Sequence, residues 1–142
     1  MNHTLEGSCQ CGEVQYQIKG EPLVLYRCHC TECQKQSGSG FGMSMWVRND
    51  DFKILRGSLK HFQRTADSGG KMECFFCGNC GVRIFHKTLN IKQDFIVLKP
   101  GTLHNTKHFN PPLILDSRVS RHGSYLQMIP IISKYHRILR SS

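Results

Sequence analysis

All eight cysteines of this 142-residue chain lie in three short clusters, and these clusters constrain the fold more than any other feature. The sequence reads CQC at 9–11, CHCTEC at 28–33 and CFFCGNC at 74–80. Disulfides between such near neighbours would close almost no loop and would constrain the unfolded chain little. The same spacings suit chelation, and in a reducing compartment clustered thiols are typical metal ligands or redox groups. The pattern therefore indicates a fold organised around bound metal.

The length fits one compact domain, for which we expect bounds of 1–142, with a core over about 4–130 and a basic tail over 131–142. The first residues lack the pattern of a secretory signal, and no apolar run approaches the ~20 residues that span a bilayer. We therefore expect a cytoplasmic protein that does not associate with membranes.

The net charge is +9, since 19 Lys and Arg residues stand against 10 Asp and Glu residues. Such a surface attracts anions, whether nucleic acid, anionic lipid or a small acidic metabolite. The basic residues are scattered, and no block of five like charges occurs. This distribution disfavours a dedicated nucleic-acid arm, so nucleic acid is not the expected partner.

Short alternating, β-branched or aromatic stretches recur along the chain and indicate a mainly β fold with antiparallel sheets. They predict strands at 13–20, 41–47, 52–55, 59–64, 71–76, 82–86 and 94–98. Two short helices are expected, one over 31–38 with Thr31 as N-cap and one over 131–139. The prolines at 111–112 predict an irregular passage leading into a late strand.

The first and last clusters together predict a closed four-cysteine zinc site. In a strand, residues i and i+2 share a face, so Cys9 and Cys11 can present two thiolates together. Cys77 and Cys80 form a CxxC pair whose glycines, at 78 and 81, would give the tight turn and positive φ of a zinc knuckle. We expect a structural zinc here; the alternative is four simply buried cysteines.

The middle cluster predicts a different kind of centre. Cys28, Cys30 and Cys33 supply three thiolates, which leaves one position of a tetrahedral zinc open, as in catalytic sites. Zinc held by three thiolates carries a net negative charge, which Lys35, Arg27 or backbone amides would offset.

Two other side chains are candidates for a fourth ligand that would close the open position. Cys74 would do so if it joined the middle cluster, but three residues before Cys77 in a strand it faces the opposite way, which favours a buried small hydrophobe. His29 stands between two ligands and should point away from their metal, where it would orient groups or handle protons. Either closure would make the protein a zinc-stabilised scaffold.

Several other residues have both a functional and a structural interpretation. Ser37, Gly38 and Gly40 suit either backbone contact with an anionic substrate or a helix stop. Phe41 and Trp46 suit either a pocket wall or the core. Three histidines are either acid-base groups or simply exposed surface residues: His104, His108 and His122.

Four blocks of the sequence resemble those of the glutathione-dependent formaldehyde-activating enzyme (GFA) family, also called centromere-protein-V-like. The blocks are GSCQCGEVQY, CHCTECQKQSGSGFG, FFCGNCGVRIF and KPGTLHN, and the likeness runs from about residue 4 to 120. The resemblance implies a tent-like (Mss-four-like), zinc-clamped β fold. It also implies structural zinc on Cys9, Cys11, Cys77 and Cys80 and catalytic zinc on Cys28, Cys30 and Cys33.

The activity implied by the resemblance is a carbon-sulfur lyase or synthase reaction, in which the thiol of glutathione adds reversibly to formaldehyde. A small-molecule thiol and an aldehyde would be the partners, and a basic surface suits the two carboxylates of glutathione. The alternative is a non-enzymatic zinc-stabilised module that contacts nucleic acid or protein through its basic surface. A third hypothesis, a methionine sulfoxide reductase, would need Cys74 as its nucleophile.

Overall fold

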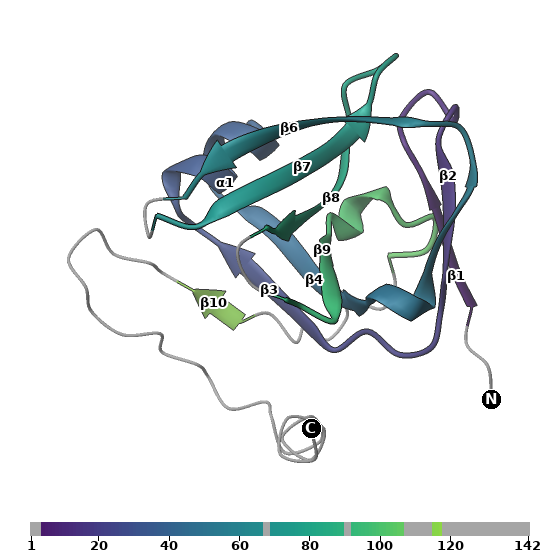
Figure 1. The fold of residues 1–142 in the computed structure, drawn as a ribbon, viewed down its shortest axis with the longest axis horizontal. Coiled ribbons are helices and arrows are strands. Elements are labelled where there is room, and N and C mark those ends of the chain that lie inside the picture. Colours follow the sequence, from purple (N-terminus) through teal and green to yellow (C-terminus); the bar gives the residue numbers. More distant parts are fainter. Residues whose placement is uncertain (1–3, 67–68, 90–91, 107–114, 118–142) are drawn as a thin grey trace.

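A computed structural model describes residues 4–66, 69–89, 92–106 and 115–117, and this part of the chain is mainly β (Figure 1). Strands and helices follow one another closely, and most connections are short. The elements in chain order are β1 (Thr4–Ser8), β2 (Gln15–Lys19), β3 (Val24–Cys28), α1 (Thr31–Ser37), β4 (Gly42–Arg48), the 3₁₀ turn η1 (Asn49–Asp51), β5 (Phe52–Arg56), β6 (Leu59–Thr65), β7 (Lys71–Cys77), β8 (Arg83–Thr88), β9 (Phe95–Leu98), the 3₁₀ turn η2 (Pro100–Thr102) and β10 (Leu115–Ser117).

The strands form two sheets. A three-stranded sheet has the order β1-β2-β5, and a seven-stranded sheet has the order β10-β3-β4-β9-β8-β7-β6. Figure 1 shows β1 and β2 at one side of the molecule, with the larger sheet curving from β3 and β10 to β6 and β7. All neighbours are antiparallel except β10, which pairs with β3 in parallel.

The predicted mainly β, antiparallel class is confirmed, and each of the seven predicted strands is present. The prediction had no strand at β1 or β3, where TLEGS and VLYRC carry little alternation. The first predicted helix is α1, but its N-cap is Cys30 and not Thr31. The second predicted helix, the two prolines and the basic tail lie outside the described residues, and the proposed domain bounds stay a prediction.

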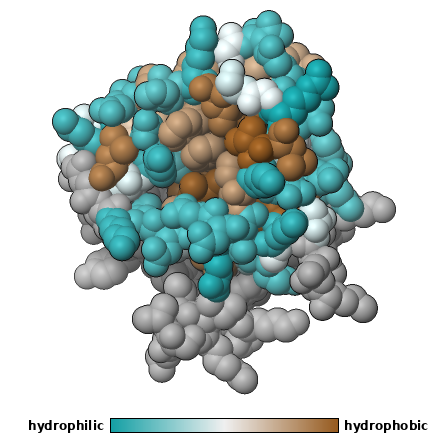
Figure 2. Space-filling model, turned by 45° about the vertical axis from the view of Figure 1, so that its right-hand side comes forward, coloured by the Kyte–Doolittle hydropathy of each residue, from teal (hydrophilic) through white to brown (hydrophobic). Residues whose placement is uncertain are grey.

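The core lies where the two sheets meet, and β2 shows how the sequence directs it. Tyr16 and Ile18 are fully buried while the residues between and beside them are more exposed, the period-2 pattern of a half-buried strand. Strand β9 is buried at three consecutive positions because it lies in the middle of the larger sheet. Cys9 and Cys77 belong to the same apolar cluster. Figure 2 shows a face on which polar side chains surround a gathering of hydrophobic ones.

A chain of hydrogen bonds ties the small sheet to η2. The Thr102 hydroxyl donates to the carbonyl of Lys99 at 2.7 Å, so the Tyr16 hydroxyl, 2.7 Å from Thr102 Oγ1, is the donor of the second bond. Gly7 leaves room for this contact, because a Cβ there would collide with the Tyr16 ring and the Thr102 carbonyl. Strand β2 therefore holds the turn that directly follows Lys99.

Within the described ranges no helix has the length and apolar character needed to cross a bilayer.

Candidate metal centres

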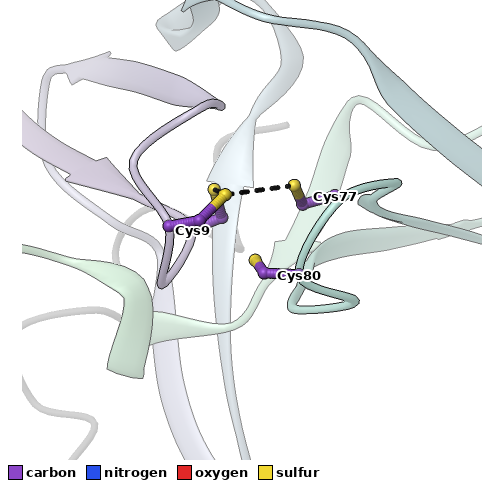
Figure 3. Close-up of side chains that lie close together, drawn as sticks. Cys9, Cys77 and Cys80 are labelled. Atoms are coloured by element: carbon purple, nitrogen blue, oxygen red, sulfur yellow. Dashed lines mark hydrogen bonds between the residues drawn. The ribbon is translucent and has the colours of Figure 1, made fainter.

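The first and last cysteine clusters meet between the two sheets, as predicted. The sulfurs of Cys9, Cys11, Cys77 and Cys80 all lie within 4.8 Å of one another. Cys9 and Cys11 are 3.5 Å apart, and Cys11 and Cys77 are 3.8 Å apart. Figure 3 shows Cys9, on the loop after β1, facing Cys77, at the end of β7, and Cys80, on the turn that follows. The cluster therefore links the small sheet to the large one.

The local reason for this convergence differs from the prediction. Cys9 and Cys11 do not lie in a strand; they occupy the tight turn between β1 and β2. The Gly12 N–H donates to the Cys9 carbonyl, and the Cys9 N–H donates to the Val14 carbonyl. The turn folds the two thiols to one side, so the CxC spacing works here through turn geometry and not through strand alternation.

The knuckle glycines also differ from each other. Gly81 has a φ of +80°, as predicted, and its N–H donates to the Cys77 carbonyl. Gly78 has no positive φ; a Cβ there would instead lie 2.9 Å from the Lys60 side chain, so its small size makes room for β6. Glycine is therefore required at the two positions for different reasons: backbone conformation at Gly81 and space for a neighbouring side chain at Gly78.

Backbone N–H groups surround these sulfurs in a way that favours thiolates. The Val14 N–H donates to Cys9 Sγ at 3.3 Å, and the Asn79 N–H donates to Cys77 Sγ at 3.4 Å. Hydrogen bonds from the backbone of Val82 and Cys11 lower the pKa of Cys80 to about 6. A hydrogen bond from the Asn79 side chain lowers the pKa of Cys11. By contrast, backbone hydrogen bonds from Cys80 and Asn79 lower the pKa of Cys77, but burial and the side chains of Cys80 and Cys9 outweigh them and raise it to about 11.

The middle cluster forms a second centre. The sulfurs of Cys28, Cys30 and Cys33 lie within 4.8 Å of one another, at the end of β3 and the start of α1. Cys30 Sγ accepts the Cys33 N–H at 3.4 Å and so is itself the N-cap of α1. Helix α1 packs closely on β4, since a Cβ on Gly42 would lie 3.1 Å from Cys33 Cβ. The strand and the helix together fix the three thiols.

Lys99 is a cation that the structure places beside this centre and that the sequence prediction, which named Lys35, Arg27 or backbone amides, did not include. Of the predicted groups, a backbone amide is present: the Cys33 N–H donates to Cys30 Sγ. Lys99 is 7% exposed, and its ammonium donates to Ser44 Oγ at 3.2 Å. A hydrogen bond with Cys28 and burial raise the pKa of Cys33, whereas Lys99 lowers it. The signal in the sequence was a lysine directly after the buried strand β9, in the KPGT block.

Neither alternative ligand joins the middle cluster. Among the described residues, Cys74 and His29 are absent from both groups of converging ligand atoms. Cys74 is fully buried in β7, in register with His86 of β8, which agrees with its interpretation as a small core residue. A reductase nucleophile must reach its substrate, so this burial argues against the third hypothesis.

The remaining singled-out residues have mainly structural surroundings. Gly38 ends α1 in the left-handed conformation, with a φ of +64° and its N–H on the Gln34 carbonyl. The Trp46 ring stacks on Phe95, with centroids 4.3 Å apart, and the Arg27 guanidinium lies over Phe41. His104 is exposed, with Nε2 3.2 Å from Ser8 Oγ. His108 and His122 lie outside the described residues.

Both centres fit zinc by the chemistry and spacing of their donors. A Zn–S bond of about 2.3 Å in a tetrahedron places neighbouring sulfurs about 3.8 Å apart, close to the separations in the four-cysteine group. Thiolate ligands select soft or borderline metals, zinc among them. Four thiolates fill a tetrahedron, whereas three leave one position open to another ligand. The two clusters therefore suit a closed and an open centre.

Comparison with known proteins agrees with this arrangement. The family model described as "Glutathione-dependent formaldehyde-activating enzyme" matches residues 4–115, which include all three cysteine clusters. This chain belongs to the GFA family.

A curated relative and a solved structure add to the family match. A Halomonas elongata protein named "Putative glutathione-dependent formaldehyde-activating enzyme" is 32% identical over 81 residues, which cover 54% of this chain and 51% of that protein. The chain thus spans about half the length of this GFA relative. A crystal structure of a Rhodobacter sphaeroides protein matches with a TM-score of 0.56 at 21% identity, covering 73% of this chain and 94% of the other. That likeness concerns the fold alone.

Proposed function

We propose that the chain catalyses the reversible addition of a thiol of the glutathione type to a small aldehyde such as formaldehyde, a carbon-sulfur lyase or synthase reaction. The observation that carries the proposal is the pair of unequal cysteine centres, one with four converging sulfurs and one with three. Membership of the GFA family supports the same reaction class.

Zinc is the cofactor we propose for both centres. Cys9, Cys11, Cys77 and Cys80 would hold a structural ion, and Cys28, Cys30 and Cys33 would hold a catalytic one. When bound at the three-cysteine centre, zinc would supply a coordination position at which an incoming thiol has a lowered pKa.

The reaction itself balances without an oxidant or reductant. The thiol loses its proton, and its sulfur forms a bond to the aldehyde carbon. The electron pair of the C=O π bond moves to oxygen, which takes up a proton, and the product is a hydroxymethyl thioether. In reverse the C–S bond breaks and the aldehyde is released.

The chain's own residues contribute position and charge to this step. Strand β3 and helix α1 hold the three thiols, and the Cys30 N-cap fixes the start of the helix. The Lys99 ammonium, buried beside Cys33, offsets part of the negative charge of three thiolates. An otherwise anionic centre is thereby made less repulsive to an anionic thiol.

Metal analysis and exchange NMR test the proposal. We expect two zinc equivalents per chain, and faster exchange between formaldehyde and its glutathione adduct than in buffer alone. Cys33→Ala should remove one equivalent and the rate enhancement together. Cys74→Ala removes a buried thiol outside both groups and should keep both. One zinc with no rate enhancement in the unaltered chain would contradict the proposal and favour a zinc-stabilised binding module.

A further inference from the structure

A hollow beside the helix that carries Cys33 has a positively charged wall. It has a volume of about 410 Å³ and lies between the C-terminal end of α1, the start of β8 and η2. Its lining includes Gln36, Ser37, Arg83, Lys99 and Thr102. No lining residue is an aspartate or a glutamate. An occupant of this hollow would meet two cations and several uncharged hydrogen-bonding groups.

The two cations have donors to spare. Arg83 and Lys99 form no ion pair with a carboxylate within the described part of the chain. Lys99 Nζ makes one hydrogen bond there, to Ser44, although an ammonium has three N–H groups. The Arg83 guanidinium lies 5.2 Å from the centre of the Phe62 ring, a contact that leaves its edge free to donate. Both groups are held in place before any ligand arrives.

A buried histidine interacts electrostatically with both cations of the hollow. His86 on β8 is 7% exposed, and no described residue forms a hydrogen bond with its Nδ1. Burial, together with Lys99, Arg83 and Arg64, lowers the pKa of His86 to about 2. The ring therefore stays neutral, because burial and the nearby cations both oppose a positive charge on it.

The hollow and the three-cysteine centre share a wall. Gln36 and Ser37 belong to the same short helix as Cys33. Lys99 faces both, since it lines the hollow and its pKa, which burial lowers, is raised by Cys33 and Cys28. A small molecule that places an anionic group against Arg83 and Lys99 would thus have its other end near the three thiols.

We propose that this hollow is a carboxylate subsite, in which Arg83 and Lys99 bind an anionic end of the thiol substrate while its sulfur reaches the three-cysteine centre. The inference rests on the proposed function and deepens it, because it names the feature that selects thiols carrying a carboxylate. Arginine presents a planar fork that matches a carboxylate, and lysine adds a point charge.

Binding to the cobalt-loaded chain tests the subsite without an activity measurement. The probes are glutathione, 2-mercaptoethanol, which has a thiol and no carboxylate, and S-methylglutathione, which keeps the carboxylates and blocks the sulfur. Cobalt absorption reports a thiol at the metal, and calorimetry reports S-methylglutathione. Arg83→Gln should weaken glutathione and S-methylglutathione about tenfold or more, the usual effect of losing a hydrogen bond to a charged group. It should leave 2-mercaptoethanol unchanged.

Two further variants keep the test decisive. Lys99→Met retains the length of the side chain and should weaken S-methylglutathione, which does not bind through its sulfur, if Arg83→Gln fails to fold. Arg56→Gln, on an exposed position of β5, removes the same charge elsewhere and should change none of the affinities. Three results would overturn the subsite: equal weakening of all three probes by Arg83→Gln, no weakening of S-methylglutathione by either pocket variant, or no binding of S-methylglutathione to the unaltered chain.

Failure of the proposed function gives a different result. In that case neither glutathione nor 2-mercaptoethanol would alter the cobalt absorption. S-methylglutathione binding that depends on Arg83 would then still support the carboxylate subsite.

Discussion

Cys30 has two roles, and replacing its sulfur with the oxygen of serine would separate them. Its sulfur converges with Cys28 and Cys33, and it also accepts the Cys33 N–H as the N-cap of α1. A serine can accept the same N–H and is a better N-cap than alanine, but its hydroxyl is a poor substitute for a thiolate ligand. The helix and the metal centre therefore respond to different properties of this side chain.

We predict that Cys30→Ser and Cys30→Ala both lower the zinc content from two equivalents to one. Cys30→Ser should be about 1 kcal/mol more stable than Cys30→Ala, because it retains the cap. Metal analysis and urea denaturation of both variants, prepared with one zinc, check this pair of results. Equal stability of the two variants would show that the cap contributes nothing.

Tyr16 gives a pH-dependent prediction at the same scale. Burial raises its pKa from 10.0 to about 12, while the hydrogen bond with Thr102 acts weakly in the other direction. The unfolded chain releases this proton first, so the free energy of unfolding should fall as the pH rises from about 10 to 12, by up to about 3 kcal/mol. Tyr16→Phe should lose about 1 kcal/mol at pH 8 and show a shallower alkaline decline. Urea titrations at pH 8, 10 and 11 compare the two chains; parallel declines would contradict the assignment.

Among the structural elements, the turn between β1 and β2 and the turn after β7 depend on each other. They carry the four-cysteine group, whose partners stand 66 positions apart in the chain at Cys11 and Cys77. A metal ion there would close a long loop and join the two sheets.

We predict that Cys11→Ser loses one zinc equivalent and has a lower Tm than Cys28→Ser, which also loses one equivalent. Cys28 joins only β3 to the adjacent α1, so its centre closes a short loop and stabilises the fold less. Thermal unfolding with metal analysis of both variants makes the comparison. A lower Tm for Cys28→Ser would reverse this ranking of the two centres.

These elements also show what the sequence can predict. Periodicity indicated seven strands, and cysteine spacing predicted which sulfurs converge, because both signals are local. Strand β1 gave no such signal because Gly7 is its only buried residue, and its pairing depends on Tyr16 across the sheet. Lys99 and Arg83 could not be assigned to one hollow, since only the tertiary fold brings η2 beside β8. The sulfurs of Cys9 and Cys11 converge because the turn folds them to one side, whereas the prediction had relied on strand alternation.

For the molecule as a whole, the two unequal centres predict two rates of metal loss. A centre with three protein thiols should yield its ion to a chelator faster than one with four, because its fourth coordination position is open to the chelator. We expect release in two steps of one equivalent each, followed with a coloured chelator. Exchange activity should vanish with the first step and the cooperative thermal transition should shift mainly with the second; single-step release would show equivalent centres.

The hydrogen bonds from Tyr16 through Thr102 to the Lys99 carbonyl have a consequence for specificity. Strand β2 begins just after the four-cysteine turn, so these bonds connect that turn with the backbone of Lys99, which lines the hollow. If the proposed subsite selects acidic over uncharged thiols, that selection depends on the position of Lys99. A metal ion at the four-cysteine group would then influence the choice of substrate without contacting it.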